Sequence, residues 1–353
     1  MEALDKILES IQPSDRAAYA ACFAHWDSLC KPLRGLGDFE EAIARIGAMQ
    51  RTGRPHIDRR AVVIMGADNG VVAEGVTQTG SEVTRQVLEN MGKGISSACV
   101  MSSALYARVI PVNIGMLTDA DHARVRNVAV AHGTGNIRTG DAMSRETCKR
   151  AILTGAQIAM ELAADGYDLL IVGEMGIGNT TTMAACAAAL FGADASAVTG
   201  RGAGLSDSAL KKKVVVVREA VSRAKADPND PIDVISRVGG LDIAGMTGVY
   251  LGAAAAGIPA LIDGAISGMA ACFAAMLCPA ARDYMIATHA SAERAGELTL
   301  RYLGLKPFLY AGMHLGEGTG ALMCLPMLDA AMRMYYRLPA FEEAGVEPYV
   351  HPE

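Results

Sequence analysis

The chain has few aromatic side chains and no basic tract. Phe, Trp and Tyr number 6, 1 and 10 among 353 residues, too few for a platform on which nucleic-acid bases stack. Lys and Arg total 32 against 38 Asp and Glu, so the formal net charge is −6, and a nucleic-acid backbone would find no electrostatic partner. Hydrophobic residues make up 51%, which excludes a disordered chain. Nucleic acid is therefore not an expected partner.

The eight cysteines lack the spacings of metal sites and redox motifs. None forms a C-x-x-C pair or joins a Cys/His cluster with zinc spacing. Most lie in apolar runs, where a free thiol behaves as a small hydrophobe. His289 and His314 have no companion ligands at suitable spacing. We therefore expect reduced cysteines, no metal and a reducing, cytoplasmic location.

A membrane segment is also not expected. The opening MEALDKILESI is typical of a charged amphipathic helix and not of a signal peptide. Residues 249–281 carry almost no charge, but glycines and prolines interrupt them, whereas a spanning helix needs about 20 apolar residues in one piece. This stretch predicts a helix, a buried strand at IPALID and a second buried helix.

Short β-branched runs alternate with Ala-rich helical stretches along the centre of the chain. The expected strands are residues 61–68, 107–115, 167–176 and 257–264. Such alternation predicts an α/β fold, with a parallel, Rossmann-like sheet flanked by helices. Both chain ends are helical in pattern. The predicted organisation is a nucleotide- and base-binding core of residues 55–320, and a small helical subdomain of residues 1–54 and 321–353.

The segment VGEMGIGNTTTMAA (172–185) has the pattern of a phosphate loop. A hydrophobic strand ends there, Gly176 and Gly178 follow, and an Ala-rich helix begins. The N–H groups at such a helix start attract anions. No G-K-[ST] follows, which excludes a Walker A loop, and Thr181 replaces the third glycine of a dinucleotide fingerprint. A phosphate site and an ordinary capped strand-to-helix turn remain the alternatives.

Isolated polar residues mark further candidate segments. Glu317 lies between Gly316 and Gly318, so its carboxylate is free of neighbouring bulk, although a solvated loop glutamate has the same pattern. Asp263 stands almost alone in apolar sequence, and a buried aspartate needs hydrogen-bond partners. The turn GRGAGLSDSALKKK (200–213) ends in three lysines, of which we interpret two as a solvated helix face.

Together these segments resemble the nicotinate-nucleotide–dimethylbenzimidazole phosphoribosyltransferase family over about residues 31–338. The landmarks, in chain order, are KPLRGLG, ADNGV, GNI, GEMGIGNTTT, GRGAG, VGGLDIAGMTG, LIDG, HASAE and LGEGTGA. The resemblance implies transfer of 5-phosphoribose from nicotinate mononucleotide to an aromatic base, giving an α-ribotide for cobamide assembly and free nicotinate. It implies no cofactor, because the pyridinium leaving group becomes neutral at its nitrogen as it departs.

The resemblance also implies roles for individual residues. Glu317 would be the general base, and Glu174 would assist near the ribose. Lys213 would be the counter-charge of the phosphate, and Asp263 would hold ribose hydroxyls. The residues expected around the nucleotide and its phosphate are Gly176, Gly178, Asn179, Thr180, Gly202, Lys213, Asp263, Ser291 and His314. Those expected around the acceptor base are Asn69, Thr79, Val87 and Leu315.

Departures from the family pattern leave the acceptor open. Asn69 replaces the usual histidine of A-D-H-G-V, His314 replaces an arginine, and the run VTQTGSEVT lacks the usual proline. Fewer polar contacts at Thr79 and Val87 would suit phenol or p-cresol, the acceptors of a sister activity with two paralogous subunits. A non-catalytic subunit and a nucleotide-binding enzyme of another reaction type are further alternatives. The resemblance implies a dimer, either of identical chains or with a paralogue.

Overall fold

The computed structural model describes residues 2–349, and its centre is a sheet of six parallel strands. The strands are β1 (Arg60–Ala67), β2 (Ala107–Gly115), β3 (Arg126–Asn127), β4 (Leu169–Met175), β5 (Ala260–Ile262) and β6 (Met285–Ala287). The spatial order β3-β2-β1-β4-β5-β6 is that of a doubly wound nucleotide-binding sheet. The predicted α/β class and all four expected strands are confirmed. The strands β3 and β6 were not expected, because no glycine-bounded apolar run contains them in the way that GIPALIDG (257–264) contains β5.

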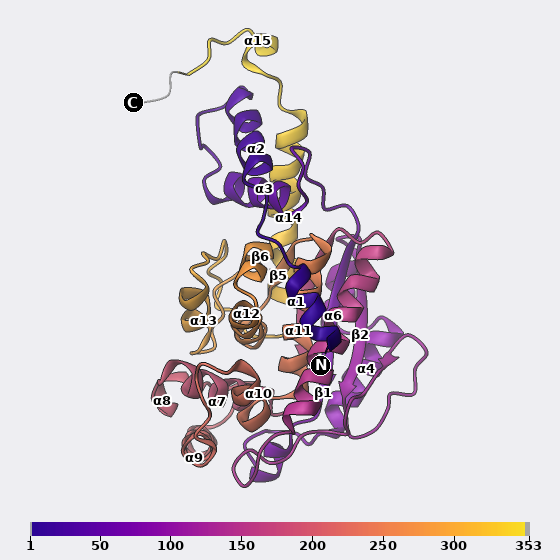
Figure 1. Ribbon diagram of the computed structural model, residues 1–353, viewed down its shortest axis with the longest axis vertical. Coiled ribbons are helices and arrows are strands. Elements are labelled where there is room, and N and C mark those ends of the chain that lie inside the picture. Colours follow the sequence, from indigo (N-terminus) through magenta and orange to yellow (C-terminus); the bar gives the residue numbers. More distant parts are fainter. Residues whose placement is uncertain (1, 350–353) are drawn as a thin grey trace.

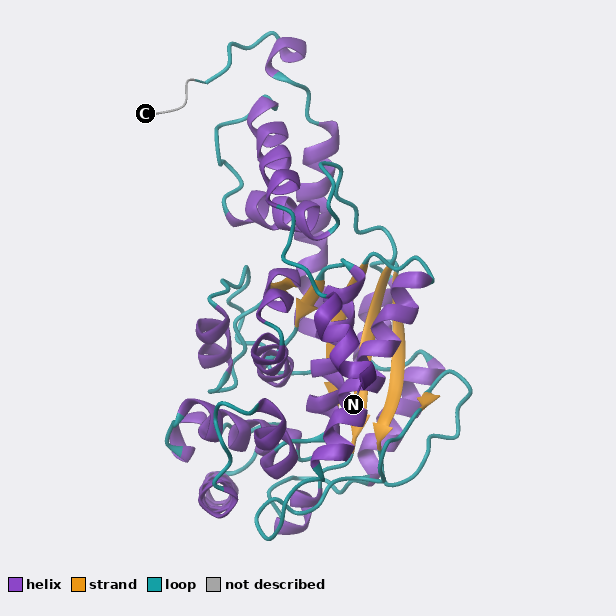
Figure 2. Ribbon diagram, in the orientation of Figure 1, coloured by secondary structure: helices purple, strands orange, loops and turns teal. Residues whose placement is uncertain are grey.

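Burial explains why the central strands are nearly continuous apolar runs. Every residue of β1 is buried, and β1 pairs with β2 on one side and with β4 on the other. Helices cover both faces of the sheet (Figure 2), so neither face of a central strand meets water. The strand order reverses between β1 and β4, and sheets of this type bind ligands beyond the carboxyl ends of their strands near such a reversal.

Glycines allow the closest helix pair of the core. The helices α6 (Arg145–Ala164) and α11 (Leu241–Ala256) pack along one another. A Cβ on Gly155 would lie 2.0 Å from the carbonyl oxygen of Gly245, and one on Gly248 would lie 1.9 Å from that of Ile152. The other core helices are α4 (Glu82–Lys93), α5 (Ser97–Ser103), α7 (Asn179–Phe191), α8 (Ala195–Val198), α9 (Asp207–Ala224), α10 (Pro231–Val238), α12 (Ala265–Leu277) and α13 (Gly296–Leu303), with 3₁₀ turns η1 (Gly70–Glu74) and η2 (Pro279–Tyr284).

The uncharged stretch at residues 249–281 forms α11, β5 and α12, as its pattern predicts. Within residues 2–349, every helix is too short or too polar to span a bilayer.

A group of helices extends beyond one end of the sheet (Figure 1). It contains α2 (Arg16–Ser28), α3 (Asp38–Met49), the second half of α14 (Thr319–Arg337) and α15 (Phe341–Ala344). The rings of Trp26 and Tyr335, from α2 and α14, lie 5.0 Å apart. The first helix, α1 (Glu2–Ser10), packs instead on α6 and α11 of the core. The proposed subdomain therefore starts after α1, and residues 350–353 of that prediction lie outside the described part of the chain.

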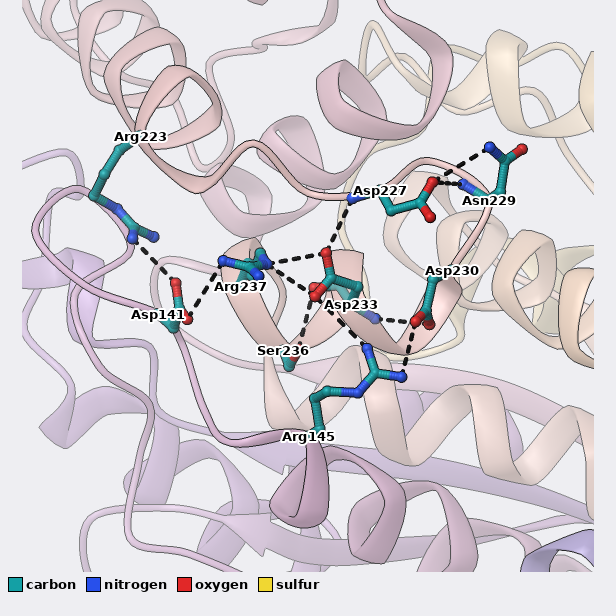
Figure 3. A network of polar contacts seen from close by, with 9 residues as sticks. All are labelled: Asp141, Arg145, Arg223, Asp227, Asn229, Asp230, Asp233, Ser236 and Arg237. Carbon is teal, nitrogen blue, oxygen red and sulfur yellow. Dashed lines mark hydrogen bonds and ion pairs between the residues drawn. The ribbon is translucent and has the colours of Figure 1, made fainter.

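A network of charged side chains fastens the segment before α6 to α9 and α10 (Figure 3). Asp141 accepts from Arg223 at 3.0 Å, and Arg145 binds Asp230 at 2.8 Å. Each such partly exposed pair contributes little alone. Near the start of the same segment, Thr134 Oγ1 accepts the N–H of Gly70 at 3.1 Å, so the segment lies against the end of β1.

Candidate active site

A cavity of about 310 Å³ lies at the carboxyl ends of β4 and β5. Most of the predicted site residues line it: Glu174, Gly176, Gly178, Asn179, Thr180, Gly202, Lys213, Asp263, Ser291, His314, Thr79, Leu315 and Glu317. A larger cleft of about 1060 Å³ lies between the helical extension and the β6 edge, and none of the predicted residues lines it. The smaller cavity is therefore the candidate site.

Glu317 is held in a strained loop on the wall of this cavity. The φ angles of Gly316, Glu317 and Gly318 are all positive, at 92°, 57° and 75°. A non-glycine residue in the left-handed region costs free energy that the surrounding structure must supply, and such residues concentrate at functional sites. The carboxylate Oε2 accepts the N–H of Ala98 at 3.0 Å. The flanking glycines thus turn the chain sharply and present a fixed carboxylate.

Asp263 fastens that loop to the sheet. Its Oδ2 accepts the N–H of Gly318 at 3.1 Å, and its Oδ1 accepts those of Gly320 at 2.8 Å and Ala321 at 3.1 Å. Burial raises the pKa of Asp263 to about 6, although these backbone donors lower it. Both oxygens are already engaged, so Asp263 serves as an anchor of the Glu317 loop. Asp263 also lines the cavity, and its expected contact with ribose hydroxyls stays a prediction.

Glu174 ends β4 at the floor of the cavity. Its Oε2 accepts from the side-chain amide of Asn179, the first residue of α7. Burial is the largest cause that raises the pKa of Glu174 to about 8; the nearby carboxylates of Asp242, Asp263 and Glu317 act in the same direction, and the Asn179 amide opposes them. These surroundings favour the neutral form of Glu174.

One end of the cavity is suited to an anion. Lys213 is only 1% exposed, and its Nζ donates to Thr180 Oγ1 at 2.7 Å beside the start of α7. Burial lowers the pKa of Lys213 to about 8, while the charge of Glu293 opposes this. Lys211 and Lys212 are exposed, as expected of a solvated helix face. A buried cation beside a helix N-terminus favours a phosphate group.

The acceptor prediction is only partly matched by the cavity wall. Thr79 and Leu315 line the cavity, whereas Asn69 and Val87 do not. Asn69 is buried behind Gly178, where its amide donates to the carbonyl oxygen of Ile177 at 3.4 Å. Val87 packs against the hydrophobic core from α4. Two of the four residues expected at the base, Asn69 and Val87, thus lie outside the cavity wall, and any effect of theirs on the acceptor would be indirect.

Three residues that the sequence did not single out also shape the site. The Gln78 amide donates to the carbonyl oxygen of Gly204 at 2.6 Å and so joins two loops that line the cavity. Glu293 accepts the N–H of Gly202 at 2.9 Å. Asp242 is fully buried next to Glu174. Each lies inside a segment already noted (VTQTGSEVT, HASAE and VGGLDIAGMTG). Membership in these segments was the signal in the sequence that could have identified them.

The chain matches one protein family along nearly its whole length. A family model described as "Phosphoribosyltransferase" matches residues 11–346. The nicotinate-nucleotide–dimethylbenzimidazole phosphoribosyltransferase of Chloroflexus aurantiacus is 41% identical over 351 residues, which are 99% of this chain and 100% of the relative. That of Acetivibrio thermocellus is 42% identical over 323 residues, which are 92% of each.

Solved structures agree with this similarity. The crystal structure of CobT from Thermus thermophilus is 38% identical, with a TM-score of 0.89 over 94% of this chain and 100% of that one. Sequence and fold thus point to the same group of proteins.

Proposed function

This chain belongs to the nicotinate-nucleotide–dimethylbenzimidazole phosphoribosyltransferase family, and we propose that it transfers 5-phosphoribose from nicotinate mononucleotide to 5,6-dimethylbenzimidazole for cobamide synthesis. The observation that carries this function is the strained Glu317, whose carboxylate lines the same cavity as the anion site around Lys213. No relative named above supports the phenol-using alternative.

The nucleotide phosphate would occupy the end of the cavity at α7. The helix start supplies N–H groups there, and Lys213 and Thr180 supply an ammonium and a hydroxyl. Burial of an unpaired ammonium is costly, and a phosphate dianion would offset that cost. Gly202 and Ser291 border the same space.

The acceptor base would lie between this nucleotide and the Glu317 loop. Val76, Thr79 and Leu315 offer it apolar surface and a hydroxyl. Leu315 is 60% exposed, so binding of an aromatic ring would remove apolar surface from water.

Glu317 would act as the general base. The imine-type nitrogen of the benzimidazole forms a bond to C1′ while the N–H proton on the other ring nitrogen passes to the Glu317 carboxylate. The bond from C1′ to the pyridinium nitrogen breaks, and its electron pair stays with that nitrogen, so nicotinate leaves without needing a proton. The Ala98 N–H and the Asp263 anchor keep the carboxylate in place.

We propose further that the enzyme is a cytoplasmic homodimer. Ile95, Val100 and Tyr106 are 64%, 64% and 90% exposed along one short segment that includes α5. Ala98 of this segment binds Glu317, so a second copy covering the segment would also border the active site. Light scattering on the purified chain tests this: a single-chain mass would refute the dimer, and dependence on a second, different chain would favour a heterodimer.

The proposed chemistry is tested with Glu317→Gln. Purified protein is mixed with nicotinate mononucleotide and dimethylbenzimidazole, and ribotide and nicotinate are measured. Loss of the base should lower kcat about 100-fold to 10,000-fold, with little change in nucleotide affinity. Glu297→Gln is the matched control, because Glu297 is on α13 with a side chain that is 82% exposed. Unchanged turnover of Glu317→Gln would contradict the assignment of the base.

A further inference from the structure

Asp242 is a buried carboxylate with one unused oxygen. It lies in the first turn of α11 and is 0% exposed. Its Oδ1 accepts the N–H of Ile243 at 2.9 Å, whereas its Oδ2 has no hydrogen-bond partner among residues 2–349. A buried polar atom of this kind costs free energy and calls for a functional or structural reason.

The unused oxygen faces the active-site floor. A Cβ on Gly176 would lie 2.9 Å from Asp242 Oδ2 and 3.3 Å from Asn179 Nδ2. Only glycine lets the chain pass so close to both atoms. Asn179 Nδ2 in turn donates to Glu174 Oε2. One side-chain amide therefore lies between the carboxyl groups of Asp242 and Glu174.

These two carboxyl groups cannot both be ionised at low cost. No basic side chain forms an ion pair with either in the described part of the chain. Burial is the largest cause that raises the pKa of Glu174, to about 8, and the charge of Asp242 is the next. Burial also raises the pKa of Asp242, to about 6, but the Ile243 N–H lowers it, as do the amides of Asn179 and Asn69, which lie nearby without forming a hydrogen bond to Oδ2. The proton therefore stays on Glu174.

The remaining neighbours act in the same direction. Asp263, from the end of β5, and Glu317, from the loop before α14, also face Glu174 and favour its neutral form. Glu174 lines the cavity, but Asp242 does not. Asp242 thus cannot contact substrate and can act only through Glu174 and Asn179.

We propose that Asp242 is a positioning residue for phosphoribosyl transfer, which keeps Glu174 neutral so that its O–H donates a hydrogen bond into the cavity. This inference rests on the proposed function. Nicotinate mononucleotide carries a negative phosphate and a negative carboxylate, so an ionised Glu174 beside Glu317 would repel it. A neutral Glu174 instead offers a donor to the ribose oxygens.

The structure contains a matched control. Asp68 is also buried, and one of its oxygens, Oδ1, also lacks a partner among the described residues, while Oδ2 accepts the N–H of Leu117 at 2.8 Å. The carboxylates that contribute most to the raised pKa of Glu174 are those of Asp242, Asp263 and Glu317, and Asp68 is not one of them. If the role of Asp242 were only structural, replacement of either aspartate by asparagine would have the same effect on the pH profile of activity.

The test is the pH profile of kcat/KM for nicotinate mononucleotide with dimethylbenzimidazole. In the unmodified chain we expect activity to fall as pH rises through about 8, where Glu174 ionises. Asp242→Asn should move this fall about one pH unit or more lower, with near-normal activity restored at pH 6. Asp68→Asn should leave its position unchanged. Equal profiles for the two variants would overturn the proposal.

A second variant keeps the test decisive if Asp242→Asn does not fold. Glu174→Gln is neutral at every pH, whereas Lys213, whose pKa burial lowers to about 8, still loses its charge there. The alkaline limb of log kcat/KM should therefore fall with a slope of one proton in Glu174→Gln and of two protons in the unmodified chain, and equal slopes would overturn the proposal. If the unmodified chain makes no ribotide at any pH, the proposed function itself fails, which is a different result.

Discussion

The substitution Lys213→Met should stabilise the ligand-free protein and, at the same time, abolish tight nucleotide binding. The Lys213 ammonium is buried, and Thr180 Oγ1 accepts its hydrogen bond at 2.7 Å. Burial lowers its pKa from 10.5 to about 8. Each pKa unit corresponds to about 1.4 kcal/mol, so holding the charge at pH 7 costs roughly 3 kcal/mol of stability.

The sign of the pH dependence follows from the lowered pKa. Below pH 8, Lys213 is charged in both the folded and the unfolded chain, and the folded chain bears the full penalty. As pH rises from about 8 towards 10.5, the folded chain releases its proton first, so this penalty disappears. Lys213→Met has no such penalty at any pH. The stability difference between the two proteins should therefore shrink above pH 8.

The assay is thermal unfolding at pH 7 and pH 9.5, with and without nicotinate mononucleotide. For a chain of this length, roughly 3 kcal/mol raises Tm by about 4 °C, less the cost of leaving Thr180 unpaired. Added nucleotide should raise Tm of the unmodified protein and leave Tm of Lys213→Met nearly unchanged. Lys211→Met, at an exposed neighbouring position, should match the unmodified protein. A lower Tm for Lys213→Met at pH 7 would refute the reasoning.

Three other variants test the site and its support. Asp263→Ala removes the acceptor of three backbone N–H groups, so the free energy of unfolding should drop by about 3 kcal/mol and turnover should fall strongly. An unchanged free energy of unfolding in a denaturant titration would contradict the role of Asp263 as an anchor. Gln78→Ala removes the amide that joins two cavity loops, which should raise KM for both substrates roughly fivefold at similar kcat. Unchanged KM values would show that the hydrogen bond from Gln78 to Gly204 does not shape the substrate site. Gly320→Ala places a Cβ 1.9 Å from His289 Cε1, so Tm should drop, whereas Gly140→Ala meets nothing within 4 Å and should leave Tm within about one degree.

Local patterns predicted the parts of the fold that are set by local burial. The strands β1, β4 and β5 and the buried second half of β2 are nearly continuous apolar runs because both of their faces are covered. In β6 only three residues are extended, and no longer glycine-bounded apolar run contains them, whereas one contains the equally short β5. The position of α1 on the core depends on contacts with α6 and α11 far along the chain, and no local signal reports those.

The site was predictable where glycines mark it and less so where distant segments meet. Glu317 could be singled out because glycines flank it, whereas the role of Lys213, one of three adjacent lysines, came from the family resemblance. The partners of Asp263 are N–H groups more than 50 positions away, so its anchoring role follows only from the fold. Asp242 reaches Glu174 through Asn179 across three elements, and its motif gives no hint of that contact.

The most direct measurement of the central claim is an acceptor competition on the single purified chain. Nicotinate mononucleotide is supplied with equal amounts of dimethylbenzimidazole, adenine, phenol and p-cresol, and products are separated by mass. We predict mainly the dimethylbenzimidazole α-ribotide, with one nicotinate released for each ribotide formed. Phenolic ribotides in excess, or no release of nicotinate with any acceptor, would contradict the account.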